Sequence, residues 1–219
     1  FGSQNLQGGI TDTKKEHFIN DMRTAGLDIV ALQETKSKDE VQIGEHIFFC
    51  HGTADENRAG VGILLGPEGV KAWKRAGQPK PFRCGEIAGA ARIMAIELHF
   101  KDNDRKTLKV YVISAHLPTC SFSDDNYQEA LDALADTVKR CPKNGVPLVF
   151  ADMNACIGIR KEYDADTVAN SLGPYGIPGR DNNGRGRMVL NWLIEHKLCV
   201  PSSFFEKKTY VTHHRSGNH

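Results

Sequence analysis

The sequence has no long hydrophobic run and no excess of charge of either sign. No apolar stretch approaches the roughly 18 residues that a membrane-spanning helix needs, and the first residues show no signal-peptide pattern. The formal net charge of +1, from 28 basic and 27 acidic residues, argues against a strongly basic coat for nucleic acid. We therefore expect no membrane association, and any nucleic-acid site has to use a few local cations.

Cysteine is present at six positions, none of which falls in a metal-binding pattern. The sequence contains no CxxC pair and no Cys/His spacing of a zinc finger, which argues against a structural zinc site. Cys50 and Cys199 stand in strand-like surroundings. We expect reduced, mostly buried thiols, as in an intracellular protein.

Repeats, low-complexity segments and Pro/Ser-rich linkers are also absent, so we expect residues 1–219 to form a single domain. The content of 40% hydrophobic and 25% charged residues is ordinary for a globular domain with a core of good size. The sequence starts at Phe1 rather than at a methionine, which leads us to expect an excised domain or a processed product.

Expected helices and strands alternate along the chain. Apolar residues at helical spacing predict helices over residues 11–25, 123–140 and 187–198. Short apolar runs between turn residues predict strands over residues 27–32, 47–50, 60–65, 93–100, 108–114, 146–151, 200–205 and 209–212. This alternation predicts a layered α/β fold with a mixed or antiparallel sheet core. Residues 155–186, between the predicted strand 146–151 and the predicted helix 187–198, form an irregular stretch that is long enough to indicate a functional or mobile loop.

Polar side chains follow several of these strands. Asp152 and Asn154 come after the apolar run 146–151, which we expect to be a buried central strand. The side-chain period of a strand is two, so both should point the same way. Other strand ends carry Asn5, Glu34 and His116. Each has an ordinary structural explanation when taken singly, such as a turn residue, a surface acid or a buried histidine.

Taken together, these residue types fit phosphodiester hydrolysis. A carboxylate can hold a divalent cation, and Mg²⁺ takes only one or two carboxylates because it keeps several waters. A second carboxylate can orient or deprotonate water, while amide and imidazole groups donate hydrogen bonds to a phosphate on which charge develops.

Four motifs resemble, in order, those of the exonuclease–endonuclease–phosphatase superfamily. The motifs are Asn5-Leu6-Gln7-Gly8, Leu32-Gln33-Glu34-Thr35-Lys36, Ser114-Ala115-His116-Leu117-Pro118 and Ala151-Asp152-Met153-Asn154. The resemblance implies a deoxyribonuclease I-like α/β fold, a four-layered sandwich in which two β-sheets pack together and helices flank them.

Later motifs are similar to the endonuclease domain of LINE-type (non-LTR) retrotransposons. They are Leu172-Gly173-Pro174-Tyr175-Gly176, the stretch from Gly179 to Gly186, Ser202-Ser203-Phe204-Phe205 and Lys208-Thr209-Tyr210. This resemblance implies an enzyme that nicks target DNA and leaves a 3′ hydroxyl, with Mg²⁺ or alternatively Mn²⁺ as cofactor. It also implies DNA as the partner, a nuclear location and a monomeric domain of a larger polyprotein.

By the same likeness, Glu34 holds the metal with the help of Asn5. His116 contacts or protonates near the scissile phosphate, Asp152 orients or deprotonates the water, and Asn154 positions the phosphate. Substrate binding falls to Arg180, Asn183, Arg185, Ser203 and Thr209. Further DNA contacts are expected from Arg160, Lys161, Arg187, Lys207 and Lys208, although any one of these can be an ordinary solvated charge.

The sequence departs from the superfamily at two places. His116 stands where abasic-site enzymes usually have Tyr, and a histidine at this place is closer to deoxyribonuclease I and the phosphatases. The closing Ile-Asp-Tyr and Ser-Asp-His motifs do not occur, so we expect a chain truncated at its C-terminus. Two alternatives stay open at this point. One is a phosphatase or phosphodiesterase of the same superfamily, and the other is a catalytically silent, domesticated domain that binds nucleic acid.

Overall fold

The computed structural model describes residues 1–53, 59–101, 104, 106–163, 165–176 and 184–206. The chain forms two compact units, which comprise residues 1–154 and 155–219. We describe each unit by itself. Among the described helices, none combines the length and the apolar character needed to cross a lipid bilayer.

The first unit contains a mixed five-stranded sheet, called the first sheet below. Its strands lie in the order β1 (Gly2–Asn5), β2 (Ile29–Gln33), β5 (Val61–Leu65), β4 (His46–His51) and β3 (Glu40–Ile43). β1 and β2 are parallel, and the other neighbours are antiparallel. All residues of β2 and β5 are buried, which explains why these strands are continuous apolar runs in the sequence.

A four-stranded sheet, the second sheet, completes the sandwich of this unit. Its strands lie in the order β11 (Gly145–Asp152), β10 (Thr107–His116), β9 (Ile93–Lys101) and β6 (Phe82–Arg83). Here β10 and β11 are parallel, and the other neighbours are antiparallel. A separate short hairpin joins β7 (Glu86–Ile87) to β8 (Ala90–Ala91). Each sheet thus contains one parallel pair of strands.

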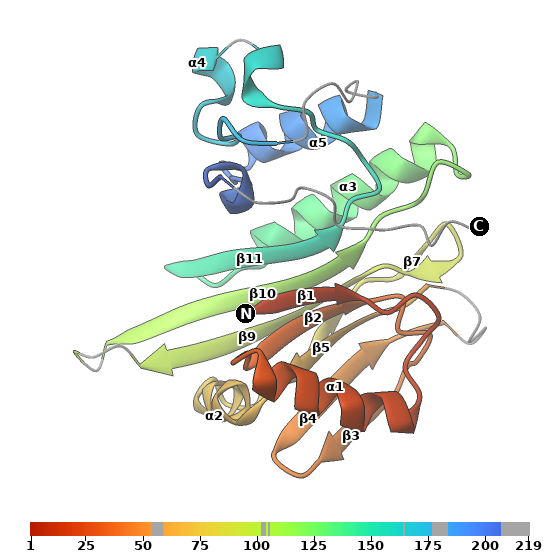
Figure 1. Ribbon diagram of the computed structural model, residues 1–219, viewed down its shortest axis with the longest axis vertical. Coiled ribbons are helices and arrows are strands. Elements are labelled where there is room, and N and C mark those ends of the chain that lie inside the picture. Colours follow the sequence, from red (N-terminus) through yellow and green to blue (C-terminus); the bar gives the residue numbers. More distant parts are fainter. Residues whose placement is uncertain (54–58, 102–103, 105, 164, 177–183, 207–219) are drawn as a thin grey trace. The chain divides into compact units, whose positions relative to one another are not determined.

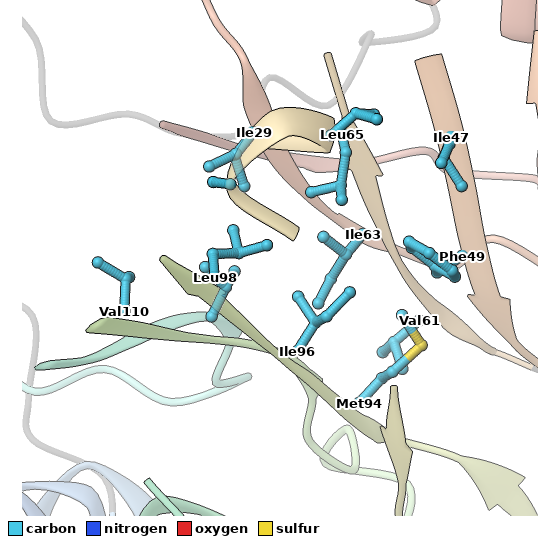
Figure 2. Packing of buried hydrophobic residues seen from close by; sticks show 13 residues of the cluster. Ile29, Ile47, Phe49, Val61, Ile63, Leu65, Met94, Ile96, Leu98 and Val110 are labelled. Atoms are coloured by element: carbon cyan, nitrogen blue, oxygen red, sulfur yellow. The ribbon is translucent and has the colours of Figure 1, made fainter. Parts of the chain in front are cut away.

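The main core lies between the two sheets and consists of branched aliphatic residues with a few larger side chains (Figure 2). Alternate residues of each strand point into it, among them Ile29, Ile63 and Leu65 from the first sheet, and Met94, Ile96, Leu98, Val110 and Val112 from the second. Burying one such side chain contributes roughly 1.5–3 kcal/mol, so this layer supplies much of the stability of the unit.

Helices cover the outer faces of the two sheets. α1 (Asp12–Thr24) packs Ile19 and Met22 on the first sheet, and α3 (Asp124–Lys139) covers β9 and β10 of the second. Figure 1 shows α1 and α3 on opposite sides of the paired sheets. The order helix, sheet, sheet, helix confirms the predicted four-layered α/β sandwich. Thr11 and Ser123 cap the two helices by accepting hydrogen bonds from backbone N–H groups.

One helix of the first unit was missed. α2 (Pro67–Arg75) lies within a stretch that the sequence predicts as strands and turns, and its Val70 and Ala72 join the core between the sheets. Pro67 suits the first turn of a helix, but Gly69 lowers the helix propensity of a nine-residue segment. The pattern is too short to separate a helix from a buried strand.

The described part of the second unit consists of short helices separated by irregular segments. It contains η1 (Arg160–Glu162), α4 (Ala165–Val168), α5 (Gly184–Glu195) and η2 (Pro201–Ser203). A small core forms from Val168, Leu172 and Leu190. The predicted third helix is confirmed as α5, which begins three residues before the expected start and ends three before the expected end.

Three expectations about local structure were wrong. Residues 200–205 are not a strand, because Pro201 begins the 3₁₀ turn η2. Cys199 is exposed rather than buried. The expectation of free thiols agrees with the structure, in which none of the six cysteines forms a disulfide. β11 is only partly buried, with Val146 44% exposed. In the described part of the chain β11 stands last in its sheet, and an apolar run does not distinguish such a strand from a central one.

Candidate active site

The carboxyl ends of the two parallel strand pairs carry the predicted catalytic side chains. In the first sheet, Asn5 ends β1 and pairs with Gln33, which Glu34 follows directly. In the second sheet, His116 ends β10 and pairs in register with Asp152 at the end of β11. Parallel strands end at the same edge of a sheet, so each pair brings its polar residues together.

Asn5 joins the polar ends of the two sheets. Its Nδ2 donates to Glu34 Oε1 at 2.9 Å and to Asp152 Oδ2 at 3.0 Å, and its Oδ1 accepts from the backbone N–H of Gln7 at 3.0 Å. One amide therefore contacts two carboxylates from different sheets. Hydrogen bonds to ionised acceptors are stronger than neutral ones, which favours a defined position for both carboxylates.

The backbone around Glu34 is held in an uncommon conformation. Glu34 has φ +57° and Lys36 has φ +49°, both in the left-handed region that non-glycine residues seldom adopt. Between them, Thr35 is fully buried and its N–H donates to the Gly60 carbonyl at 3.3 Å. Backbone strain that the surroundings hold in place is concentrated at functional sites. The Glu34 side chain stays 31% exposed and can reach a ligand.

His116 is the most buried member of the group, with 6% exposure. Its Nε2 lies 4.0 Å from Glu34 Oε1, and its Nδ1 finds no hydrogen-bond partner among the described residues. Burial lowers the pKa of His116 against the opposing effect of Asp152 and Glu34, while the Arg92 guanidinium lowers it further. The imidazole is therefore neutral at neutral pH and can present one N–H donor.

Asp152 and Asn154 are arranged by a turn rather than by strand alternation, which corrects the expectation from the sequence. β11 ends at Asp152, and Asn154 has φ +46°. Asp152 Oδ1 accepts from the Asn154 N–H at 3.1 Å, and Asn154 Nδ2 donates to the Leu117 carbonyl at 2.8 Å. The Tyr127 hydroxyl donates to the Met153 carbonyl at 2.7 Å and so supports the turn from α3.

The donor set at these strand ends fits a hard divalent cation. The described residues contain no group of three or more His, Cys, Asp or Glu side chains that could hold a metal. Glu34 and Asp152 nevertheless place two carboxylate oxygens on a single amide nitrogen. Mg²⁺ prefers oxygen ligands and uses one or two carboxylates, so these residues fit this ion better than a softer metal.

The other predicted site residues lie in the second unit or outside the described residues. Arg185 is buried on α5, and Ser203 is buried with its Oγ accepting from the Gly173 N–H at 2.8 Å. Arg180, Asn183 and Thr209 lie outside the described residues. The substrate-binding roles of these five residues stay predictions.

Four supporting residues were not assigned any role from the sequence. Arg92 is buried and donates from Nη1 to the His116 carbonyl at 3.1 Å. Gln33 and Ser114 are buried between the sheets, and Tyr127 is buried on α3. They bond to backbone groups, to each other and, for Gln33, to the Ser3 hydroxyl, and sequence spacing carries no signal of such contacts. Gln33 and Ser114 do stand inside the motifs around Glu34 and His116.

The comparisons with known proteins support the fold. No protein-family model and no curated protein matches the sequence. Among solved structures, the catalytic domain of Xenopus laevis APE2 matches 87% of the chain at 13% identity, with a TM-score of 0.58. AP endonuclease LMAP from Leishmania major matches 89% of the chain at 10% identity, with a TM-score of 0.56. The chain spans 66% and 65% of these two proteins, just under two thirds of either. The likeness confirms that the chain has the deoxyribonuclease I-like α/β sandwich fold.

Proposed function

We propose that this protein is a Mg²⁺-dependent phosphodiesterase that nicks DNA and leaves a 3′ hydroxyl, as the resemblance to retrotransposon endonucleases implies. The observation that carries the proposal is the contact of Asn5 Nδ2 with carboxylates of both sheets. His116 lies beside this contact, with its Nε2 4.0 Å from Glu34 Oε1. A fold shared with two AP endonuclease-like proteins adds support. Mn²⁺ is the expected substitute for Mg²⁺ because both accept carboxylate and water ligands.

The residues at the strand ends divide the work of the reaction. Glu34, with the help of Asn5, would hold the ion, which when bound polarises a phosphoryl oxygen. Asp152 orients a water molecule and takes its proton as the new P–O bond forms. The P–O3′ bond breaks, the 3′ oxygen takes up a proton from solvent, and Asp152 releases its proton to solvent, so the products are a 5′ phosphate and a 3′ hydroxyl.

His116 and Asn154 act on the phosphate rather than on the water. The neutral imidazole of His116 donates a hydrogen bond to a non-bridging oxygen, where negative charge increases in the transition state. Donors that are already in place need no reorganisation at the moment of reaction, and the buried position of His116 provides this. Asn154, next to Asp152 in the turn, positions the phosphate.

Nicking of supercoiled plasmid DNA tests the proposal. We expect open circles with Mg²⁺, none with EDTA and none with Asp152→Asn, because the amide cannot take a proton from water. Asp136→Asn is the matched control, since Asp136 is an exposed acid on α3 paired with Lys139. A DNA polymerase should extend the nicks directly, as a 3′ hydroxyl allows.

Two results would contradict the proposal. Salt-sensitive DNA binding without any Mg²⁺-dependent nicking would favour a silent binding domain. Nicks that need removal of a 3′ phosphate before extension would exclude the proposed direction of cleavage.

A further inference from the structure

Two buried polar side chains interrupt the apolar layer between the sheets. Along β2 the inward positions are Ile29, Ala31 and Gln33, and along β10 they include Val112 and Ser114. Gln33 is 2% exposed and Ser114 is fully buried. Polar groups at such positions are costly unless they are hydrogen-bonded, so their partners show what they hold together.

Gln33 and Ser114 are bonded across the two sheets. The Ser114 hydroxyl donates to the Leu32 carbonyl of the first sheet at 2.8 Å and accepts from Gln33 Nε2 at 3.3 Å. Gln33 Nε2 also lies 3.5 Å from the Phe150 carbonyl of β11, and its Oε1 accepts from the Ser3 hydroxyl at 3.2 Å. The pair therefore contacts both parallel strand pairs.

The pair lies next to the candidate active site along every strand involved. Gln33 directly precedes Glu34, Ser114 stands two residues before His116 on the same face of β10, and Phe150 stands two before Asp152. Each of these catalytic positions thus lies one or two residues along the chain from a member of the pair or from its partner Phe150. Because so few residues separate them, the cross-sheet hydrogen bonds restrict the positions of the catalytic side chains.

The candidate active site depends on how the two sheets are aligned. Its cross-sheet contacts are Asn5 Nδ2 to Asp152 Oδ2 at 3.0 Å and His116 Nε2 to Glu34 Oε1 at 4.0 Å. Apolar contacts are not directional and allow packed sheets to shift slightly. A misplacement of about 1 Å can cost on the order of 10²-fold in rate. Directional hydrogen bonds remove this freedom.

We propose that Gln33 and Ser114 are positioning residues, which fix the alignment of the two sheets so that Asn5 reaches both carboxylates. The proposal rests on the proposed function, since it gives the pair a role in the same site. Neither residue touches the reacting atoms.

The test compares Gln33→Met, Ser114→Ala and the double variant. Each single change leaves the other polar side chain buried with one hydrogen bond fewer, whereas the double change removes both polar side chains and should recover part of the stability. We expect the double variant to lose on the order of 30- to 100-fold in kcat for a defined DNA duplex, with KM within about threefold of the wild type. Thr137→Val is the matched control, because Thr137 is buried on α3 and its hydroxyl donates within the helix, to the Ala133 carbonyl at 2.8 Å, with no cross-sheet bond to the described residues.

A second readout is independent of activity. Hydrogen exchange of the Asn5 side-chain amide, followed by NMR, reports directly on its bonds to Glu34 and Asp152. We expect this exchange to be at least about tenfold faster in the double variant and unchanged in Thr137→Val. If the double variant does not fold, Ser114→Ala alone carries both measurements.

The outcomes separate this proposal from the proposed function. Wild-type exchange at Asn5 in the double variant would overturn the positioning role, whatever the nuclease activity. Faster Asn5 exchange with an unchanged kcat in the double variant would overturn it too. So would a double variant whose kcat and melting temperature both return toward the wild-type values from those of the single variants. If the wild-type protein cleaves no DNA, the proposed function fails, and the Asn5 exchange still decides whether the pair fixes the alignment.

Discussion

At the scale of single residues, His116 occupies a costly environment. Its ring is almost completely buried, and within the described residues Nδ1 has no hydrogen-bond partner. An unsatisfied buried polar atom costs roughly 1–3 kcal/mol. Arg92, also buried, donates to the His116 carbonyl and has its own pKa lowered by burial. His116 thus lowers the stability of the folded protein, which is expected where a side chain serves chemistry rather than packing.

Replacing His116 with leucine separates these two roles. We expect His116→Leu to slow Mg²⁺-dependent cleavage by about 10²–10⁴-fold, because the phosphate loses a hydrogen-bond donor. The free energy of unfolding should stay the same or rise by about 1 kcal/mol, because an unsatisfied polar atom is removed. Urea denaturation and single-turnover cleavage measure the two effects. Loss of stability and activity together would show that the histidine is mainly structural.

Residue types at the site were predictable, but their contacts were not. Glu34, His116 and Asp152 were identified at the ends of strands whose apolar runs are visible in the sequence, and Asn5 was identified from its motif alone, since β1 has no apolar run. The contact of Asn5 with Asp152 joins residues 147 positions apart. Such a contact depends on how two sheets pack, and a single sequence contains no record of that.

At the scale of elements, the turn after β2 shows how a loop from another strand holds a catalytic residue. The N–H groups of Thr35 and Lys36 donate to the carbonyls of Gly60 and Ala59, just before β5. Gly60 has φ +94°, and a Cβ there would lie 2.7 Å from Thr35 Oγ1. The left-handed backbone at Glu34 is therefore supported from a glycine in a neighbouring strand connection.

Gly60→Ala tests this support. We expect a loss of about 2 kcal/mol in the free energy of unfolding, because an alanine is strained at this φ and crowds Thr35. Cleavage should fall as well, since the Glu34 turn has to move. Gly77→Ala is a suitable control, because Gly77 has φ +87° but a Cβ there meets nothing within 4 Å. Equal losses in both variants would mean that backbone strain alone, and not the contact with Thr35, is responsible.

The elements themselves were predictable where the pattern was long. The predicted helices at 11–25 and 123–140 agree with α1 and α3 to within one residue at each end, because both have capping hydroxyls and an apolar face. α2 was missed, and the expected strand at 200–205 was wrong, since each segment is short and contains a proline whose position decides the structure.

At the scale of the whole molecule, buried and partly buried histidines couple the free energy of unfolding to pH. Burial is the largest cause that lowers the pKa values of His46, His51 and His116 from the ordinary value of 6.5. Below pH 6.5 the unfolded chain therefore binds more protons at these positions than the folded chain. The sign follows from this difference: their contribution to stability is fully present above pH 6.5 and is lost as the pH falls through the lower folded-state values.

We expect the free energy of unfolding, measured with urea, to be lower at about pH 5 than at about pH 7.5. His46→Leu should reduce this difference in the free energy of unfolding, because the substitution removes one of the titrating side chains, on β4. An equal or higher stability at the lower pH would contradict the assignment of these histidines as neutral in the folded protein.

The residues assigned to catalysis all belong to the first unit, residues 1–154. They come from the ends of four strands in two sheets, so the intact sandwich is needed to form the site. The measurement that tests this account most directly is single-turnover cleavage of a DNA duplex over a range of Mg²⁺ concentrations, comparing the wild type with Glu34→Gln. Glu68→Gln serves as the control, since Glu68 is an exposed acid paired with Lys71.

We expect cleavage by the wild type and by Glu68→Gln to rise with Mg²⁺ to saturation and to vanish with EDTA. Glu34→Gln should be slower by at least about 10²-fold with an unchanged melting temperature, because the amide binds the cation poorly. A Glu34→Gln rate within about threefold of the wild type, with the same Mg²⁺ dependence, would contradict the assignment of these strand ends as the active site.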